Sequence, residues 1–250
     1  MVYTKMNQAK YIAHLDLARV FDRAMRRAGI QVAFSEGFNP HPKIAFGAPL
    51  PVGVEGEREY VDVKLKEDIF SEKLSDLDIS KSIEQIVNCL QVQLPEGIKI
   101  VDYIFSTEKV KPLMSVINLL CYSIEVPMTE PISDVNFKNA IANWLSRDEI
   151  FITRKGKSKL VRKNLRPFVY RLEVISQEKM ELVNLFKMKM NIIITGEGTI
   201  RPSEVMASIK ELENIPIDFD GVAVTRNELY IMNQDEVVNP LKYEDNKVRA

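Results

Sequence analysis

Apolar positions along the first hundred residues predict alternating strands and helices. From Leu17 to Ala28 they recur at i, i+3, i+4, i+7 and i+11, which is one face of an α-helix. We expect Asp16 to cap this helix and Gly29 to end it. The predicted elements are, in order, a strand at 2–5, a helix at 17–28, strands at 43–48 and 60–65, a helix at 79–90 and a strand at 98–105. This β-α-β-β-α-β order is the ferredoxin-like, or split βαβ, arrangement.

A similar order of elements, with additional strands, is predicted for the second half of the chain. The pattern predicts a strand at 115–126, a helix from about 133 to 145, strands at 150–154, 168–175 and 186–195, a helix at 202–212, and a closing hairpin of 222–225 with 228–232. We therefore expect an α+β protein made of tandem ferredoxin-like units with antiparallel sheets. The units are residues 1–108 and 113–232, and residues 233–250 form a polar C-terminal tail.

Composition narrows the class of protein. A hydrophobic fraction of 46% and a charged fraction of 28% are typical of globular proteins and exclude a wholly disordered chain. Two cysteines, Cys89 and Cys121, can supply neither a disulfide framework nor the thiolates of an iron–sulfur cluster. No window approaches the roughly 18–20 apolar residues of a membrane span, and no signal peptide is recognisable. We expect a cytoplasmic protein without a cofactor.

Both histidines lie in the first third of the chain. His14 precedes the first predicted helix, and His41 lies between two prolines that restrict the backbone on either side. Such a stiff loop can hold polar groups for a ligand, although a structural turn is the alternative. A metal site is a further possibility, but the spacing matches no compact metal motif. Candidate catalytic residues are His14, Asp16 and His41, and candidate ligand or partner loop residues are Glu36, Phe38, Asn39 and Lys43.

A basic segment runs from Arg154 to Arg171 without an acidic residue, although the net charge of the chain is only −1. Such a run favours phosphate binding, because each neutralised phosphate releases counterions. Phe168 and Tyr170 add surface on which unpaired bases can stack. A solvated loop between strands is the alternative. The candidate nucleic-acid-binding residues are Arg154, Lys155, Lys157, Lys159, Arg162, Lys163, Arg166 and Arg171.

A glycine turn at 195–202 leads into the last predicted helix. Helix N-termini bind anions, but Gly-x-Gly without a third glycine is a weak signal. A simple strand-to-helix turn is the preferred interpretation.

Several short segments of the chain resemble one bacterial family. They are His14-Leu15-Asp16, Arg26-Arg27-Ala28-Gly29, Gly37-Phe38-Asn39-Pro40-His41-Pro42, Pro49-Leu50-Pro51-Val52-Gly53, Glu59-Tyr60-Val61-Asp62, Leu165-Arg166-Pro167 and Gly198-Thr199-Ile200-Arg201-Pro202. Together they resemble the radical-SAM-associated, or radical-SAM-linked, domain of unknown function. The resemblance is strongest over the first 65 residues. Ala13 and Gly56 stand where the family often has serine, and these departures leave His14 and His41 in place.

The resemblance implies a partner rather than an activity. Members of that family occur beside, or fused to, a radical S-adenosylmethionine (SAM) enzyme with a cobalamin-binding region, often near genes for ribosome and RNA processing. The resemblance therefore suggests an accessory RNA-binding protein that works with a radical SAM enzyme in tRNA or rRNA modification or processing. One alternative is a metal-independent RNA-acting enzyme that uses His14 or His41 as general acid or base. Another is a protein-binding scaffold for the radical SAM partner.

Overall fold

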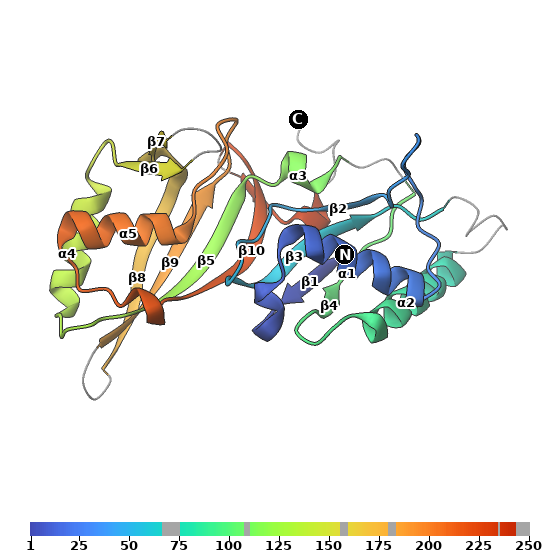
Figure 1. The fold of residues 1–250 in the computed structure, drawn as a ribbon, viewed down its shortest axis with the longest axis horizontal. Helices are drawn as coiled ribbons and strands as arrows, with labels where there is room; N and C mark the ends of the chain where they lie inside the picture. The colour runs from blue at the N-terminus through green and yellow to red at the C-terminus, as the bar shows by residue number, and fades with distance from the viewer. Residues whose placement is uncertain (67–75, 108–110, 156–159, 180–183, 235, 244–250) are drawn as a thin grey trace. The chain divides into compact units, whose positions relative to one another are not determined.

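The computed structural model describes residues 1–66, 76–107, 111–155, 160–179, 184–234 and 236–243. They form an α+β protein with a mostly antiparallel sheet, as the sequence predicts for the class (Figure 1). The chain divides into two compact units. The first contains Met1–Ile117 and Ile231–Ala250, and the second contains Asn118–Tyr230. Among the described residues, no helix has both the length and the apolar character needed to cross a bilayer.

The first unit packs two helices against an antiparallel sheet. Its main elements are β1 (Val2–Lys5), α1 (His14–Arg27), β2 (Ile44–Phe46), β3 (Glu55–Val63), α2 (Asp76–Gln93) and β4 (Ile100–Asp102). The strand order is β4-β1-β3, and β2 pairs with the end of β3, where Phe46 lies opposite Val61. Figure 1 shows α1 and α2 side by side against these strands.

The amphipathic pattern of α1 explains how this helix packs. Leu17, Phe21 and Ala24 are buried in the core of the first unit, as their helical spacing predicts. The predicted cap at Asp16 is wrong, because the helix begins at His14 and Asp16 lies within the first turn. An acidic side chain is still favourable there, because the helix dipole is positive at this end. Gly29 follows the helix with a positive φ of 69°, as predicted.

The second unit places α4 (Asp134–Leu145) and α5 (Pro202–Glu213) side by side against a four-stranded antiparallel arrangement (Figure 1). The strand order is β10-β5-β9-β8. The strands of the unit are β5 (Leu119–Pro127), β6 (Phe151–Lys155), β7 (Leu160–Asn164), β8 (Val169–Lys179), β9 (Asn184–Ile193) and β10 (Ala223–Asn233), of which the last three residues are counted with the first unit. β6 and β7 form a separate two-stranded sheet, here called the hairpin.

Burial in the second unit follows the period of a half-buried strand. Along β9, Phe186, Met188 and Met190 are buried, while Lys187 and Lys189 are not. One face of the sheet therefore forms one side of the apolar core of the unit. The buried residues of α4 and α5 form the other side.

Two predicted features of the C-terminal part differ from the structure. The hairpin expected around Arg226-Asn227 is wrong, because β10 runs through both residues with a register shift between Arg226 and Glu228. A bulge of this kind places an extra residue in the strand without ending it. Asn227 accepts a hydrogen bond of 2.8 Å from Ser123 Oγ, so its polar side chain is used within the sheet. Residues of the expected polar tail form β11 (Glu236–Val238), which pairs with β10.

The described chain also contains a short helix and several single turns. They are η1 (Asn7–Tyr11), α3 (Leu113–Val116), η3 (Arg166–Phe168), η4 (Phe219–Gly221) and η5 (Pro240–Lys242). The start of α3 is tied to the first unit, because the Leu113 N–H donates to Asp62 Oδ2 at 3.3 Å. Burial raises the pKa of Asp62 above its ordinary value.

We expect the two cysteines to differ strongly in reactivity. Cys89 is exposed, whereas burial and the opposing Glu228 raise the pKa of Cys121 to about 11. Because the thiolate is the reactive form, iodoacetamide at pH 8 should label Cys89 roughly a hundredfold faster than Cys121 in the folded protein. Peptide mass spectrometry after timed labelling measures this ratio, and Cys89→Ser isolates the slow site. Equal rates for the two thiols in the folded protein would contradict the prediction.

Candidate nucleic-acid interface

The hairpin gives four of the eight predicted basic residues, Arg154, Lys155, Arg162 and Lys163, a place in a structure with two different faces. β6 and β7 pair antiparallel, with Thr153 opposite Arg162 and Ile152 opposite Lys163. Side chains opposite one another share a face, and successive residues alternate between faces. The segment is therefore not the simple loop that the sequence left as its alternative.

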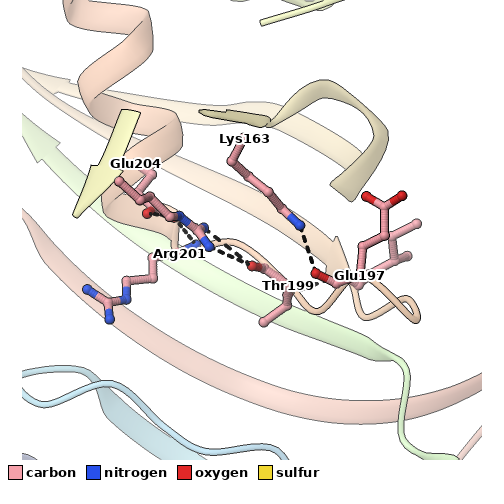
Figure 2. Close-up of polar contacts among 7 residues, drawn as sticks. Lys163, Glu197, Thr199, Arg201 and Glu204 are labelled. Atoms are coloured by element: carbon pink, nitrogen blue, oxygen red, sulfur yellow. Dashed lines mark hydrogen bonds and ion pairs between the residues drawn. The ribbon is translucent and has the colours of Figure 1, made fainter. Parts of the chain in front are cut away.

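Arg154 holds the inner face of the hairpin to the start of α5. Its Nε and Nη2 donate to the Glu204 carboxylate at 2.6 and 2.5 Å, and both Nη atoms lie 3.3 Å from the Thr199 carbonyl. Glu204 also accepts a 2.7 Å hydrogen bond from the Arg201 N–H, which would otherwise have no helical partner (Figure 2). A single carboxylate thus caps the helix and anchors the hairpin.

Lys163 makes the second anchor on the inner face. Its Nζ donates to the Glu197 carbonyl at 2.9 Å, as Figure 2 shows, and lies 4.0 Å from the centre of the Phe168 ring. Arg154 and Lys163 together fix the hairpin against the start of α5 and the segment that precedes it. Both side chains therefore stabilise the position of the hairpin.

The other face of the hairpin, here called the outer face, is exposed. It carries Phe151, Thr153, Lys155, Leu160 and Arg162. The guanidinium carbon of Arg162 lies 3.6 Å from the centre of the Phe151 ring, which is cation–π stacking. Because the Phe151 side chain holds Arg162 in place, the planar cation is presented to solvent with reduced conformational freedom.

The remaining predicted cations lie beyond the hairpin strands. Arg166 donates at 3.1 Å to the carbonyls of Leu145 and Val169, so its role in the structure is to tie chain segments together. Arg171 forms an exposed ion pair with Glu173 at 2.7 Å. Lys157 and Lys159 lie outside the described residues.

The two aromatic residues expected to stack on bases differ in accessibility. Phe168 is only 3% exposed, whereas Tyr170 is 57% exposed. Of the two, Tyr170 has a ring face that a base can reach.

The N-terminus of α5 is already occupied by a carboxylate of the protein itself, and the turn before it is held by backbone hydrogen bonds. Thr195 and Gly198 exchange backbone hydrogen bonds of 2.9 Å, and Gly198 has a φ of 93° that suits a residue without Cβ. The carboxylate of Glu204 already lies at the first turn of the helix. The segment behaves as a capped strand-to-helix turn.

The two histidines have different surroundings. His14 is the first residue of α1, is half-buried, and packs edge-on against Phe46 with ring centres 5.6 Å apart. His41 is exposed, and its N–H donates to Ser35 Oγ at 2.9 Å. Asp16 pairs with Arg19 at 2.8 Å. Among the described residues, no hydrogen bond or ring contact joins the two histidines.

The proline-rich loop is closed at its base and open at its tip. The Ser35 N–H donates to the His41 carbonyl at 2.8 Å, and Phe34 bridges to Pro42. All four of the predicted loop residues Glu36, Phe38, Asn39 and Lys43 are exposed, and Phe38 completely so. Within the described part of the chain, no three histidine, cysteine or acidic side chains come together as a metal site.

The sequence reasoning missed β7 and the role of Glu204. The local signal for β7 is weak, because Val161 is the only β-branched residue in Leu160–Asn164. Glu204 lies three residues after Arg201, at the position of a capping-box acid. That pattern identifies the helix start, but it does not reveal the ion pair with a strand far away in sequence.

Comparison with known proteins places the chain in a family. Residues 1–202 match the family described as "Uncharacterized protein conserved in bacteria (DUF2344)", and the chain belongs to it. That description names neither an activity nor a partner. No curated protein matches the chain in sequence.

Among solved structures, the chain is similar to one described as "Crystal Structure of a Cbf5-Nop10-Gar1 Complex". The match has a TM-score of 0.43 and 10% sequence identity, and covers 91% of this chain. The chain spans about half the length of the matched chain, 48% of which is covered.

Proposed function

We propose that this protein binds RNA through the outer face of the hairpin. The observation that carries the proposal is the separation of cations between the two faces. Arg154 and Lys163 are engaged with the fold on the inner face, whereas Lys155 and Arg162 are exposed and have no acidic partner among the described residues. Cations without acidic partners favour a polyanion, because the counterions of the phosphates are released on binding.

The stacked pair of Arg162 and Phe151 favours unpaired RNA as the ligand. A guanidinium plane and an aromatic ring both stack on bases, and Arg also donates to phosphate in a fixed geometry. Lys155 and Arg162 occupy diagonal positions across the hairpin, which lie about 7–8 Å apart at Cα in antiparallel pairs. Two charges at this spacing can contact separate phosphates of one strand.

We further propose that each unit is ferredoxin-like, with the hairpin as an insertion in the second. The order β10-β5-β9-β8 corresponds to fourth, first, third and second strand of a split βαβ unit. The order β4-β1-β3, with β2 on β3, is consistent with the same arrangement. The hairpin lies in the chain between α4 and β8, and this position supports the interpretation of an insertion on a rigid platform.

The biological setting that we propose is an accessory role beside a partner radical SAM enzyme, in the modification or processing of tRNA or rRNA. This part rests on the resemblance of the N-terminal motifs. The exposed Phe38 at the tip of a closed loop favours protein docking as a second function. A general acid–base role for His14 or His41 remains a prediction without a supporting contact.

Neutralising the outer face should weaken RNA binding and its dependence on salt. For the double variant Lys155→Gln/Arg162→Gln, we expect the affinity for a single-stranded RNA to fall at least tenfold at 0.1 M salt. The slope of log K against log salt should fall by roughly 1.4, since each lost contact with a single strand contributes about 0.7. Fluorescence anisotropy at four or more salt concentrations measures both quantities.

The matched control is Lys81→Gln/Lys138→Gln, which removes two exposed lysines from α2 and α4 with the same change in net charge. We expect this control to retain affinity within about twofold. The RNA-binding proposal fails if both double variants behave alike, or if the unaltered protein shows no salt-dependent binding to any RNA tested.

A further inference from the structure

The exposed face of α1 carries four arginines that differ in their partners. Arg19 pairs with Asp16 at 2.8 Å, and Arg26 pairs with Asp22 at 3.0 Å. The other two are Arg23 and Arg27, and neither forms an ion pair with an acidic residue in the described parts of the chain. Two arginines of the helix are therefore neutralised by acidic partners, and two are not.

Arg27 is held in a fixed position by neutral acceptors. Its Nε donates to Gln93 Oε1 at 3.1 Å, and its Nη2 donates to the Gln93 carbonyl at 2.6 Å. An amide oxygen and a carbonyl at the end of α2 carry only partial charges. The guanidinium is thus oriented without being neutralised, and it keeps unused N–H donors, because arginine has five.

Arg23 adds a second positive charge beside Arg27 on the exposed face of α1. It lies one helical turn before Arg27, and its side chain is exposed. Like charges four residues apart destabilise a helix. Their occurrence beside two acid-paired arginines indicates that the charge has a use outside the helix.

A cavity of about 280 Å³ lies against both arginines. It is lined by Val20, Arg23, Arg27, Gln93 and Pro95. Val20 and Pro95 give it an apolar wall, and none of the described residues that line it carries a carboxylate. It is an open hollow at the surface, and its volume is just below the usual range of about 300–1,000 Å³ for small-molecule sites.

We propose that this cavity binds a phosphate monoester. The phosphoryl oxygens accept hydrogen bonds from Arg23 and from the unused N–H groups of Arg27, while the esterified group packs against Val20 and Pro95. Arginine is suited to this contact because its planar fork donates two parallel hydrogen bonds to one phosphate. The site lies in the first unit and uses none of the hairpin residues.

Calorimetric titration with AMP and with inorganic phosphate tests the proposal directly. We expect saturable binding of both, with AMP the tighter because of the apolar wall. Arg23→Gln should weaken AMP binding at least tenfold, because each charge-assisted hydrogen bond is a strong one. The control Arg26→Gln removes an acid-paired arginine from the same helix and should change the affinity less than twofold.

Two outcomes overturn the proposal. One is the absence of saturable AMP and phosphate binding up to millimolar concentrations. The other is equal affinity of Arg23→Gln and Arg26→Gln for AMP. Arg23 makes no hydrogen bond in the described parts of the chain, and its replacement relieves the repulsion from Arg27. The thermal midpoint should therefore stay the same or rise slightly, and circular dichroism checks this.

RNA oligonucleotides with and without a 5′-phosphate distinguish the two sources of such a monoester. A preference for the phosphorylated end that Arg23→Gln removes assigns the site to RNA termini. AMP binding without that preference assigns it to free nucleotides. The result is separate from the hairpin proposal, because the Lys155→Gln/Arg162→Gln variant keeps every residue that lines this cavity.

Discussion

Replacing Trp144 with alanine should lower the free energy of unfolding by about 3–5 kcal/mol, the usual cost of removing a buried Trp side chain. Trp144 lies on α4 and is fully buried. Its indole Nε1–H donates to Ser208 Oγ of α5 at 2.9 Å, and Ser208 in turn donates to the Val205 carbonyl at 2.7 Å. The substitution leaves a large cavity and removes a link between the two helices of the second unit.

Urea denaturation followed by circular dichroism measures this loss, since the variant has no tryptophan to report fluorescence. Trp144→Phe retains most of the ring, and Ser208→Ala removes only the acceptor. The latter should cost about 1–3 kcal/mol, because the buried N–H is left unpaired. A loss of less than about 1 kcal/mol for Trp144→Ala would show that the site collapses around the smaller side chain.

Replacing Glu204 with alanine should have the second largest effect, about 2–3 kcal/mol, since it leaves a partly buried charge without its partner and removes a helix cap. The Arg154 side chain is 31% exposed and the Glu204 side chain 18% exposed. The guanidinium would keep only the Thr199 carbonyl among its present acceptors. The Arg201 N–H would lose its acceptor as well.

A double-mutant cycle with Arg154→Ala separates the ion pair from the cap. The coupling energy reports the pair, and the remainder of the Glu204 effect reports the cap. Trypsin should cut after Lys155 or Arg162 faster in Glu204→Ala than in the unaltered protein, because the hairpin is no longer anchored. Glu211→Ala, an exposed position on α5, is the control and should change stability by less than about 0.5 kcal/mol. Equal losses for Glu204→Ala and Glu211→Ala would contradict the assigned role of Glu204.

The parts of the fold that local spacing determines could be predicted from the sequence. The strand at 2–5 and the buried face of α1 agree with the structure, because each is encoded within one element. The end of the chain could not be predicted in the same way. Arg226-Asn227 has the composition of a turn, and only the partner strand β5 shows that both residues lie in a bulged strand. Register with a distant strand is not contained in a local pattern.

The same limit applies to the candidate interface. Charge alone pointed to the basic segment, but the division of its cations into two faces depends on residues far away in the chain. Glu204 is 50 residues from Arg154, and Glu197 is 34 residues from Lys163. Without these contacts, Arg154 and Lys155 are equivalent neighbours in sequence. With them, one residue stabilises the hairpin and the other is available to a ligand.

Successive side chains of the hairpin alternate between its two faces, and this alternation limits which changes in sequence the hairpin can accept. Positions on the outer face, such as Thr153, Lys155 and Arg162, can be exchanged without disturbing the anchors at Arg154 and Lys163. A deletion of one residue within β6 would instead exchange the two faces, because the side-chain period is two. Substitutions on the outer face are therefore compatible with the fold, whereas a change in strand length by one residue places the anchoring side chains on the wrong face.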